Sequence, residues 1–119
     1  MIIDISPPLD ATIGVWPGDT RFARTVSLDF ANGDDATLSH ITTTLHVGSH
    51  VDAPLHTTPG GADVASIPLD RFIGRCQVVQ VDAGRGGRIA PRHLDGKAIV
   101  APRVLFRTGT FPDFRAWNR

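Results

Sequence analysis

The chain has 119 residues, and its 12 basic residues balance its 12 acidic residues, so the formal net charge at pH 7 is zero. This length predicts one domain, residues 1–119, with a modest core. A neutral chain has no long-range field to attract nucleic acid or an anionic membrane surface, and no apolar run approaches the length of a membrane span. The opening residues lack the pattern of a secretory signal. We therefore expect a cytoplasmic protein that acts on a small molecule, with neither nucleic acid nor membrane as a partner.

Twelve glycines and nine prolines interrupt the chain too often for long helices and favour short strands joined by turns. Alternating and β-branched residues predict three strands in the first half of the chain, at residues 2–5, 23–30 and 37–47. In the second half the predicted elements are, in order, a helical turn at 68–72, a strand at 77–82, a helical turn at 91–94, and strands at 98–101 and 104–108. Both helical turns are predicted because proline can occupy a first helical position.

The end of the chain carries aromatic residues with little sequence left to cover them. Phe111, Phe114 and Trp117 follow a segment that is typical of a core strand. Such a cluster would mark an interface, a disordered tail or a chain cut short of its full length.

The stretch LHVGSHVDAPLH at residues 45–56 concentrates potential metal ligands. Four such residues have the same parity, so an extended backbone would point their side chains to one face: His46, His50, Asp52 and His56. A straight strand would hold the α-carbons of the first two histidines roughly 13 Å apart, too far for easy binding to one metal. We therefore expect a bend at Gly48 and an end to regular strand pairing at Pro54.

Two imidazoles and one carboxylate are a recurrent ligand set for catalytic zinc or manganese, with one coordination position left for water. His46, His50 and Asp52 supply this set, and the two oxygens of the aspartate could bridge two metals. His56, outside the set, is placed to move protons. The alternative is that these are merely polar residues near a turn, but their combination around a glycine and before a proline favours a metal site. The two remaining histidines, at positions 40 and 93, are predicted to be structural or surface residues.

The same stretch resembles the motif H-x-G-T-H-x-D-x-P-x-H of the cyclase-like family of metal-dependent hydrolases, with Ser49 in place of threonine. Within that family, residues 4–20 (DISPPLDATIGVWPGDT) are similar to the start of bacterial kynurenine formamidases, as is APLH followed by IPLDRFIGRCQVV. The resemblance implies an arylformamidase activity: hydrolysis of N-formyl-L-kynurenine to L-kynurenine and formate in tryptophan degradation through kynurenine.

The resemblance also implies roles for individual residues. His46, His50 and Asp52 would bind metal, with the aspartate bridging two zinc ions, and His56 would donate and accept protons. Trp16 would bind the substrate, whose anilide ring can stack on an indole; from the sequence alone, a tryptophan that anchors a core or a lid is about as good an interpretation. The implied fold is α/β, a mixed, β-rich, barrel-like sheet with peripheral helices of the swivelling β/β/α type, in a homodimer.

Members of that family are longer, and their C-terminal part supplies a further histidine and a glutamate to the metal sites, whereas this chain contains no glutamate. We therefore expect residues 1–119 to be an incomplete N-terminal portion that binds one metal well and a second one weakly, through Asp52 alone. Two alternatives stay open. The chain is another amide hydrolase of the same family, acting on an isatin-like cyclic amide, or it is an inactive remnant that still binds metal.

Overall fold

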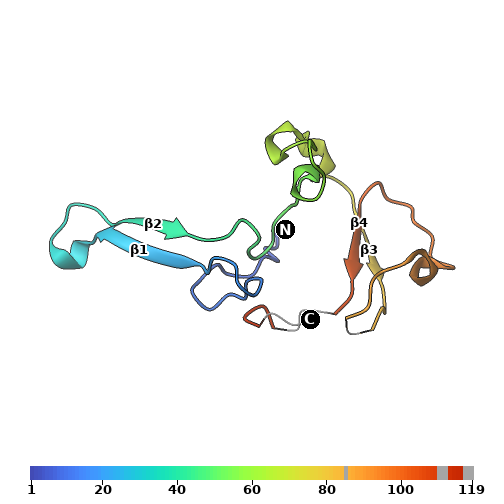
Figure 1. Cartoon of the computed structure of the whole chain (residues 1–119), viewed down its shortest axis with the longest axis horizontal. Helices are drawn as coiled ribbons and strands as arrows, with labels where there is room; N and C mark the ends of the chain where they lie inside the picture. Colours follow the sequence, from blue (N-terminus) through green and yellow to red (C-terminus); the bar gives the residue numbers. More distant parts are fainter. Residues whose placement is uncertain (85, 110–112, 117–119) are drawn as a thin grey trace. The chain divides into compact units, whose positions relative to one another are not determined.

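The computed structural model describes residues 1–84, 86–109 and 113–116. Within these described residues there are four strands and five short 3-10 helices, labelled η. In chain order they are β1 (Ala23–Leu28), η1 (Phe30–Asn32), β2 (Leu38–Thr42), η2 (Pro54–His56), η3 (Val64–Ser66), η4 (Leu69–Arg71), β3 (Gln77–Gln80), η5 (Pro91–Leu94) and β4 (Val104–Arg107) (Figure 1). The described chain divides into two compact units, residues 1–50 with 113–116 and residues 51–109.

The first unit contains an antiparallel ribbon of β1 and β2 (Figure 1). Its register pairs Arg24 with Ile41 and Val26 with Ser39, and an irregularity follows before Leu28. Every residue of both strands is exposed. The buried apolar side chains of this unit, Ile13 and Val47, lie outside the ribbon.

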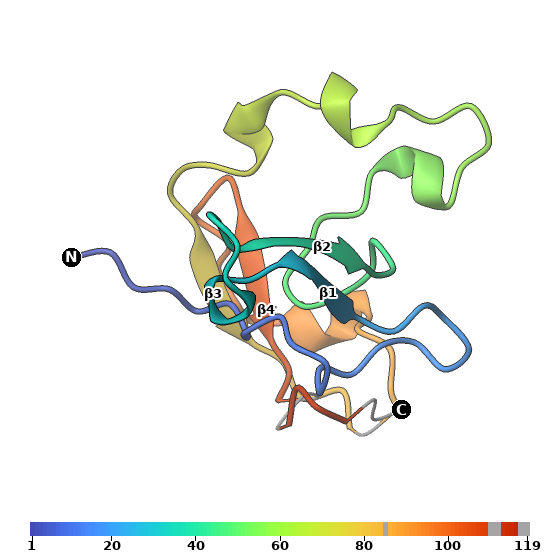
Figure 2. The ribbon, with the colours of Figure 1, turned by 90° about the vertical axis from the view of Figure 1, so that its left-hand side faces the viewer.

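The second unit contains the parallel pair of β3 and β4 (Figure 2). The pairing runs from Gln77 opposite Val104 to Gln80 opposite Arg107. Val79 and Val81 are buried here, so the apolar core of this unit lies on β3 and the residue that follows it. A parallel pair requires a long connection between its strands, and here the connection passes through η5.

The predicted strands at 23–30, 37–47, 77–82 and 104–108 are present, although each is shorter than predicted, and the predicted helical turns coincide with η4 and η5. The strands predicted at 2–5 and 98–101 were wrong. In the second case the backbone hydrogen bonds go to a side chain instead of a neighbouring strand. The side-chain Nε2 of Gln77 donates to the carbonyl of Ala98 at 2.8 Å, and its Oε1 accepts from the backbone amide of Val100 at 2.9 Å.

The fold is broadly α/β and mixed, with one antiparallel and one parallel strand pair, but the structure does not support the predicted barrel-like sheet. Among the residues that the structure describes there are two separate two-stranded sheets, no closed barrel, and only single turns of 3-10 helix. The strands are four to six residues long. Glycine and proline, 12 and nine in the chain, are frequent enough to end each element after a few residues.

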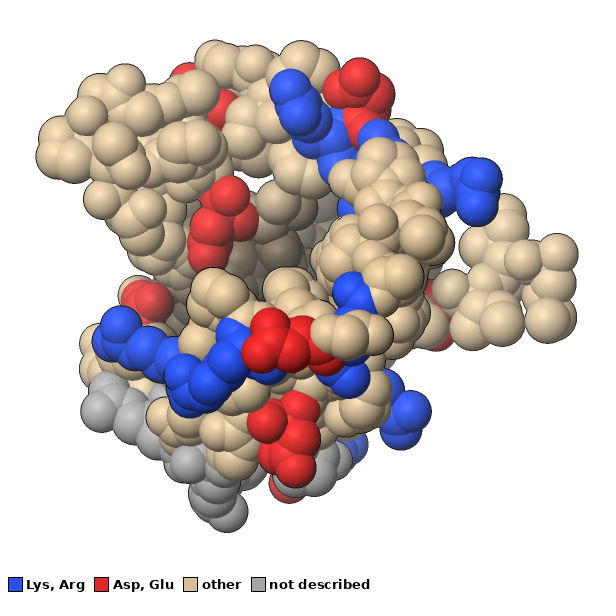
Figure 3. Space-filling view, turned by 90° about the vertical axis from the view of Figure 1, so that its right-hand side faces the viewer, with Lys and Arg blue, Asp and Glu red and all other residues tan. Residues whose placement is uncertain are grey.

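Of the predicted aromatic cluster, Phe111 and Trp117 lie outside the described residues. Phe114 is half-buried: its carbonyl accepts a hydrogen bond from the amide of Gly14 at 2.9 Å, and the Arg115 guanidinium lies 4.3 Å from its ring centroid. Basic and acidic side chains are interspersed over the face drawn in Figure 3. None of the described helices has the length and apolar character that a membrane crossing requires.

Candidate metal centre

The motif begins where β2 ends. The strand stops at Thr42, and the backbone bends through residues 45–49. Gly48 has φ +58°, in the left-handed region, and a β-carbon there would stand 2.7 Å from the Leu9 side chain and 3.5 Å from that of Ile13. The backbone conformation therefore favours glycine here, and a β-carbon would in addition force the end of the Leu9 side chain to move. The predicted bend at Gly48 is confirmed.

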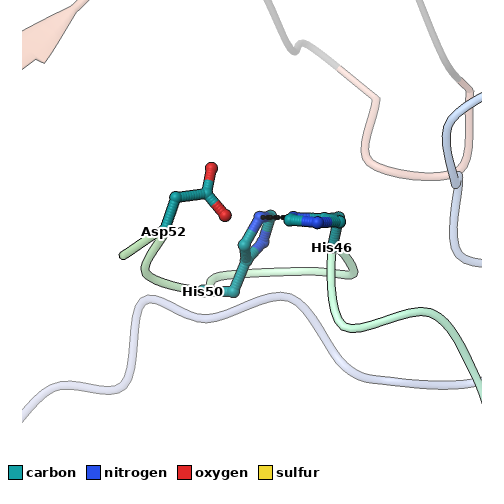
Figure 4. A group of neighbouring side chains, drawn as sticks. All are labelled: His46, His50 and Asp52. Atoms are coloured by element: carbon teal, nitrogen blue, oxygen red, sulfur yellow. Dashed lines mark hydrogen bonds between the residues drawn. The ribbon is translucent and has the colours of Figure 1, made fainter. Parts of the chain in front are cut away.

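The bend brings the first two histidines of the motif together. Nδ1 of His46 lies 3.4 Å from Nε2 of His50, and the two ring centroids are 5.3 Å apart at an interplanar angle of 69° (Figure 4). His50 Nδ1 also lies 3.1 Å from the carbonyl oxygen of Gly48. Because a carbonyl only accepts hydrogen bonds, this contact fits the neutral tautomer of His50 that carries its proton on Nδ1 and leaves Nε2 as the nitrogen nearest His46.

Asp52 completes a cluster of potential ligands. One ligand atom from each of His46, His50 and Asp52 lies within 4.8 Å of the others (Figure 4). The three side chains belong to seven consecutive residues, so their relative placement follows from the local backbone of the motif. His46 is half-buried and the other two are exposed, which leaves the cluster open to solvent.

The donor set suits a divalent transition metal. Two nitrogens bound to one tetrahedral zinc, at 2.0–2.1 Å each, lie about 3.3 Å apart, which is close to the 3.4 Å between the two imidazole nitrogens. A histidine binds a metal through an unprotonated ring nitrogen, so the neutral imidazoles are the forms that would serve as ligands here. The Gly48 carbonyl is the kind of outer partner that orients a metal-binding histidine.

A hydrogen-bonded pair, Thr44 and Asp19, lies beside the backbone of His46 and was not predicted from the sequence. Thr44, which is 8% exposed, donates its hydroxyl to the Asp19 carboxylate at 2.6 Å and accepts a hydrogen bond from the backbone amide of His46 at 3.2 Å. The Thr44 hydroxyl and the amide of Thr20 hold the pKa of Asp19 below its ordinary value, and the charge of His46 acts in the same direction. The two partners are 25 residues apart in the sequence, so only the fold brings them together.

Trp16 is presented by a tight turn. The amide of Asp19 donates to the carbonyl of Trp16 at 2.9 Å, and Gly18 between them has φ +91°. Proline at the second position and a glycine with positive φ at the third are the features of a type II turn, which the sequence Trp-Pro-Gly-Asp supplies. The Trp16 side chain is 49% exposed, which leaves a large part of the indole accessible to a ligand.

His56 is the last residue of η2 and is exposed, and it does not belong to the cluster of potential ligand atoms. Pro54 stands at the start of this turn, and its carbonyl accepts from the amide of Thr58 at 2.8 Å. The histidines predicted to be structural or surface residues behave as predicted: His40 is exposed on β2, and Nδ1 of His93 accepts from the Ala90 amide at 2.9 Å.

Comparison with known families assigns the class. Residues 3–118 match the model of the Cyclase family, described as "Putative cyclase". The match covers nearly the whole chain, and the chain belongs to the Cyclase family. This membership, together with the cluster of two histidines and an aspartate, indicates a cyclase-like hydrolase whose donor set is compatible with a metal cofactor.

Proposed function

We propose that this member of the Cyclase family hydrolyses N-formyl-L-kynurenine to L-kynurenine and formate with the help of a divalent metal. The observation that carries the metal-dependent part is the 3.4 Å spacing of His46 Nδ1 and His50 Nε2 beside the Asp52 carboxylate. The substrate is supported by the similarity of residues 4–20 to the start of bacterial kynurenine formamidases and by the exposed indole of Trp16.

His46, His50 and Asp52 would hold the ion, with zinc as the expected metal and manganese as the alternative. When bound, such an ion polarises a carbonyl oxygen and lowers the pKa of a coordinated water. A second zinc ion, if it binds, would be held by Asp52 as well. The contact of His50 Nδ1 with the Gly48 carbonyl fits the tautomer with its proton on Nδ1, which would leave Nε2 as the nitrogen that binds the ion.

The residues outside the ligand set move the proton and orient the substrate. In the reaction, the oxygen of water adds to the formyl carbon, the bond from that carbon to the aniline nitrogen breaks, and formate and a free amine leave. His56 accepts a proton from the attacking water and delivers it to the aniline nitrogen. The indole of Trp16 stacks on the aromatic ring of the substrate and so aligns the formyl group.

We also propose that the chain acts as a homodimer, with the β1–β2 ribbon in the interface. Val26, Leu28, Leu38 and Ile41 all lie on this ribbon and are between 40% and 58% exposed. A ribbon of two strands is marginally stable on its own, and a second copy would cover its apolar side chains. Sedimentation equilibrium should show a dimer that Ile41→Lys weakens. A wild-type chain that stays monomeric at all concentrations would contradict the dimer.

The experiment that tests the substrate compares the hydrolysis of N-formyl-L-kynurenine with that of isatin, a cyclic amide, by the zinc-loaded chain. We expect higher kcat/KM for N-formyl-L-kynurenine and a raised KM for it in Trp16→Ala. The exposed Phe30 on η1 offers a control, since Phe30→Ala removes an aromatic side chain far from the motif in the sequence and should leave KM unchanged. Preference for isatin would assign a different amide hydrolase of the family.

A further inference from the structure

The buried hydroxyl of Thr44 joins two parts of the chain that the proposed function uses. It donates to Asp19 Oδ2 at 2.6 Å and accepts from the amide of His46 at 3.2 Å. Thr44 is 8% exposed, and it is the only polar or charged residue that is buried in the described part of the chain. One side chain therefore links a carboxylate near the N-terminus to the backbone of the first potential ligand.

This link replaces the strand pairing that the motif lacks. β2 ends at Thr42, so the backbone amides that follow must find partners outside the ribbon. The amide of Thr44 donates to the carbonyl of Thr20 at 3.2 Å, and the amide of His46 donates to the Thr44 hydroxyl. Removal of the hydroxyl would leave the His46 amide without that partner and would release the backbone from which the imidazole projects.

At its other end the link reaches the turn that presents Trp16. Asp19 closes this turn through its amide, and its carboxylate accepts from both the Thr44 hydroxyl and the Thr20 amide, the latter at 2.7 Å. A carboxylate that accepts two hydrogen bonds is held in one orientation. The residue that ends the turn is thus the same residue that anchors Thr44.

We propose that Asp19 and Thr44 are positioning residues, which fix His46 for metal binding and tie it to the turn that carries Trp16. The inference rests on the proposed metal site, since it assigns a task to residues that support one ligand. Neither residue touches the reacting atoms. Outer residues that orient a metal ligand typically change metal affinity about 10- to 100-fold when they are removed.

The chain contains a matched control for this pair. Thr12 donates its hydroxyl to Asp10 at 2.6 Å, in the same unit and with the same chemistry, but this bond joins two neighbours in the N-terminal segment and lies far from the motif in the sequence. Thr12→Val and Thr44→Val therefore remove equivalent hydroxyls at similar volume. Thr44→Ser keeps the hydroxyl and is the conservative variant that should rescue the function.

The test measures cobalt(II) binding to the full chain by calorimetry and by its visible absorption, together with hydrogen exchange of the His46 amide. We expect Thr44→Val to bind cobalt about 10- to 100-fold more weakly and to exchange the His46 amide faster. Thr44→Ser and Thr12→Val should match the wild type. Asp19→Ala, which keeps the hydroxyl but removes its anchor, should change both readouts in the same direction as Thr44→Val, and it serves if Thr44→Val does not fold.

Suppose that the wild-type chain binds cobalt and that Thr44→Val or Asp19→Ala folds and binds it equally well. That result would overturn the positioning role and leave the metal site intact. A wild-type chain that binds neither cobalt nor zinc would instead contradict the proposed metal site, and with it the positioning role. Weaker binding in Thr12→Val as well as Thr44→Val would show a general loss of stability and would also overturn the inference.

Discussion

His46 and His50 meet across the bend at Gly48, with Nδ1 of the first 3.4 Å from Nε2 of the second. A straight strand would separate their α-carbons by roughly 13 Å. The pairing is thus a product of one left-handed glycine and the packing of Leu9 and Ile13 against it. Because Asp52 follows two residues later, a short piece of backbone assembles the whole donor set.

His50→Ala should abolish tight metal binding, because it removes one of the two imidazoles proposed as ligands. We expect cobalt affinity to fall by more than about 100-fold, which is the largest loss expected when a residue outside the ligand set is removed. Calorimetric titration of the full chain measures this. His40→Ala, at an exposed histidine of β2, is the matched control and should bind cobalt as the wild type does. Equal affinity in the two variants would exclude His50 as a ligand.

His56→Ala should keep the metal and lose the reaction. His56 lies on η2, outside the cluster of ligand atoms, so its removal leaves the donor set unchanged. Loss of a general acid and base lowers turnover by about 100- to 10,000-fold. Formate release and cobalt affinity, measured on the same sample, separate the two effects. Turnover at the wild-type level would disprove the role of His56 in proton transfer.

Gly48→Ala should destabilise the chain and weaken metal binding together. An alanine in the left-handed region costs roughly 1–2 kcal/mol, and here its β-carbon would also displace Leu9. Gly33→Ala is the control, because Gly33 has φ +86° in the same unit and a β-carbon added there would meet nothing within 4 Å. Urea unfolding should show a smaller loss for Gly33→Ala, with cobalt affinity unchanged. Equal effects of the two changes would argue against the packing of Leu9.

The Asp63 carboxylate should contribute stability that disappears in acid. It accepts from the hydroxyl of Ser66 at 2.7 Å and from its amide at 2.9 Å, and these bonds hold the pKa of Asp63 below the ordinary value of 3.8. Because the folded pKa is the lower one, the contribution is present above pH 3.8 and is lost as the pH falls through the folded pKa.

Asp63→Ala should therefore be less stable than the wild type at neutral pH, and this difference should shrink well below pH 3.8. Urea midpoints at the two pH values measure the difference. In a carboxyl titration followed by NMR, Ser66→Ala should raise the pKa of Asp63 toward its ordinary value. A difference in stability that is the same at both pH values would contradict the assignment.

The local features of the fold and of the motif were predictable from the sequence, because they depend on neighbouring residues. Alternation in residues 23–30 and 104–108 predicted β1 and β4, and the glycine between the two histidines predicted the bend. Proline at position 91 predicted η5. The same local signals over-predicted residues 2–5, which are exposed and have no strand beside them in the described chain.

The non-local features were not predictable in this way. Nothing near residue 98 shows that the Gln77 side chain will take the hydrogen bonds of a strand. Likewise, a threonine two residues before His46 has no local signature of a link to Asp19, 25 residues away. The barrel-like sheet was an expectation from the family resemblance, and strand propensity could not have tested it, since propensity predicts that a strand forms but not which strand it pairs with.

The measurement that tests the central claim most directly is formate release from N-formyl-L-kynurenine by the purified full chain, before and after removal of metal by a chelator and again after zinc is added back. The account predicts turnover that is lost with the chelator, restored by zinc in the wild type and not restored in His50→Ala. Turnover that survives the chelator, or that zinc restores equally in His50→Ala, would contradict a reaction carried out at the cluster of His46, His50 and Asp52.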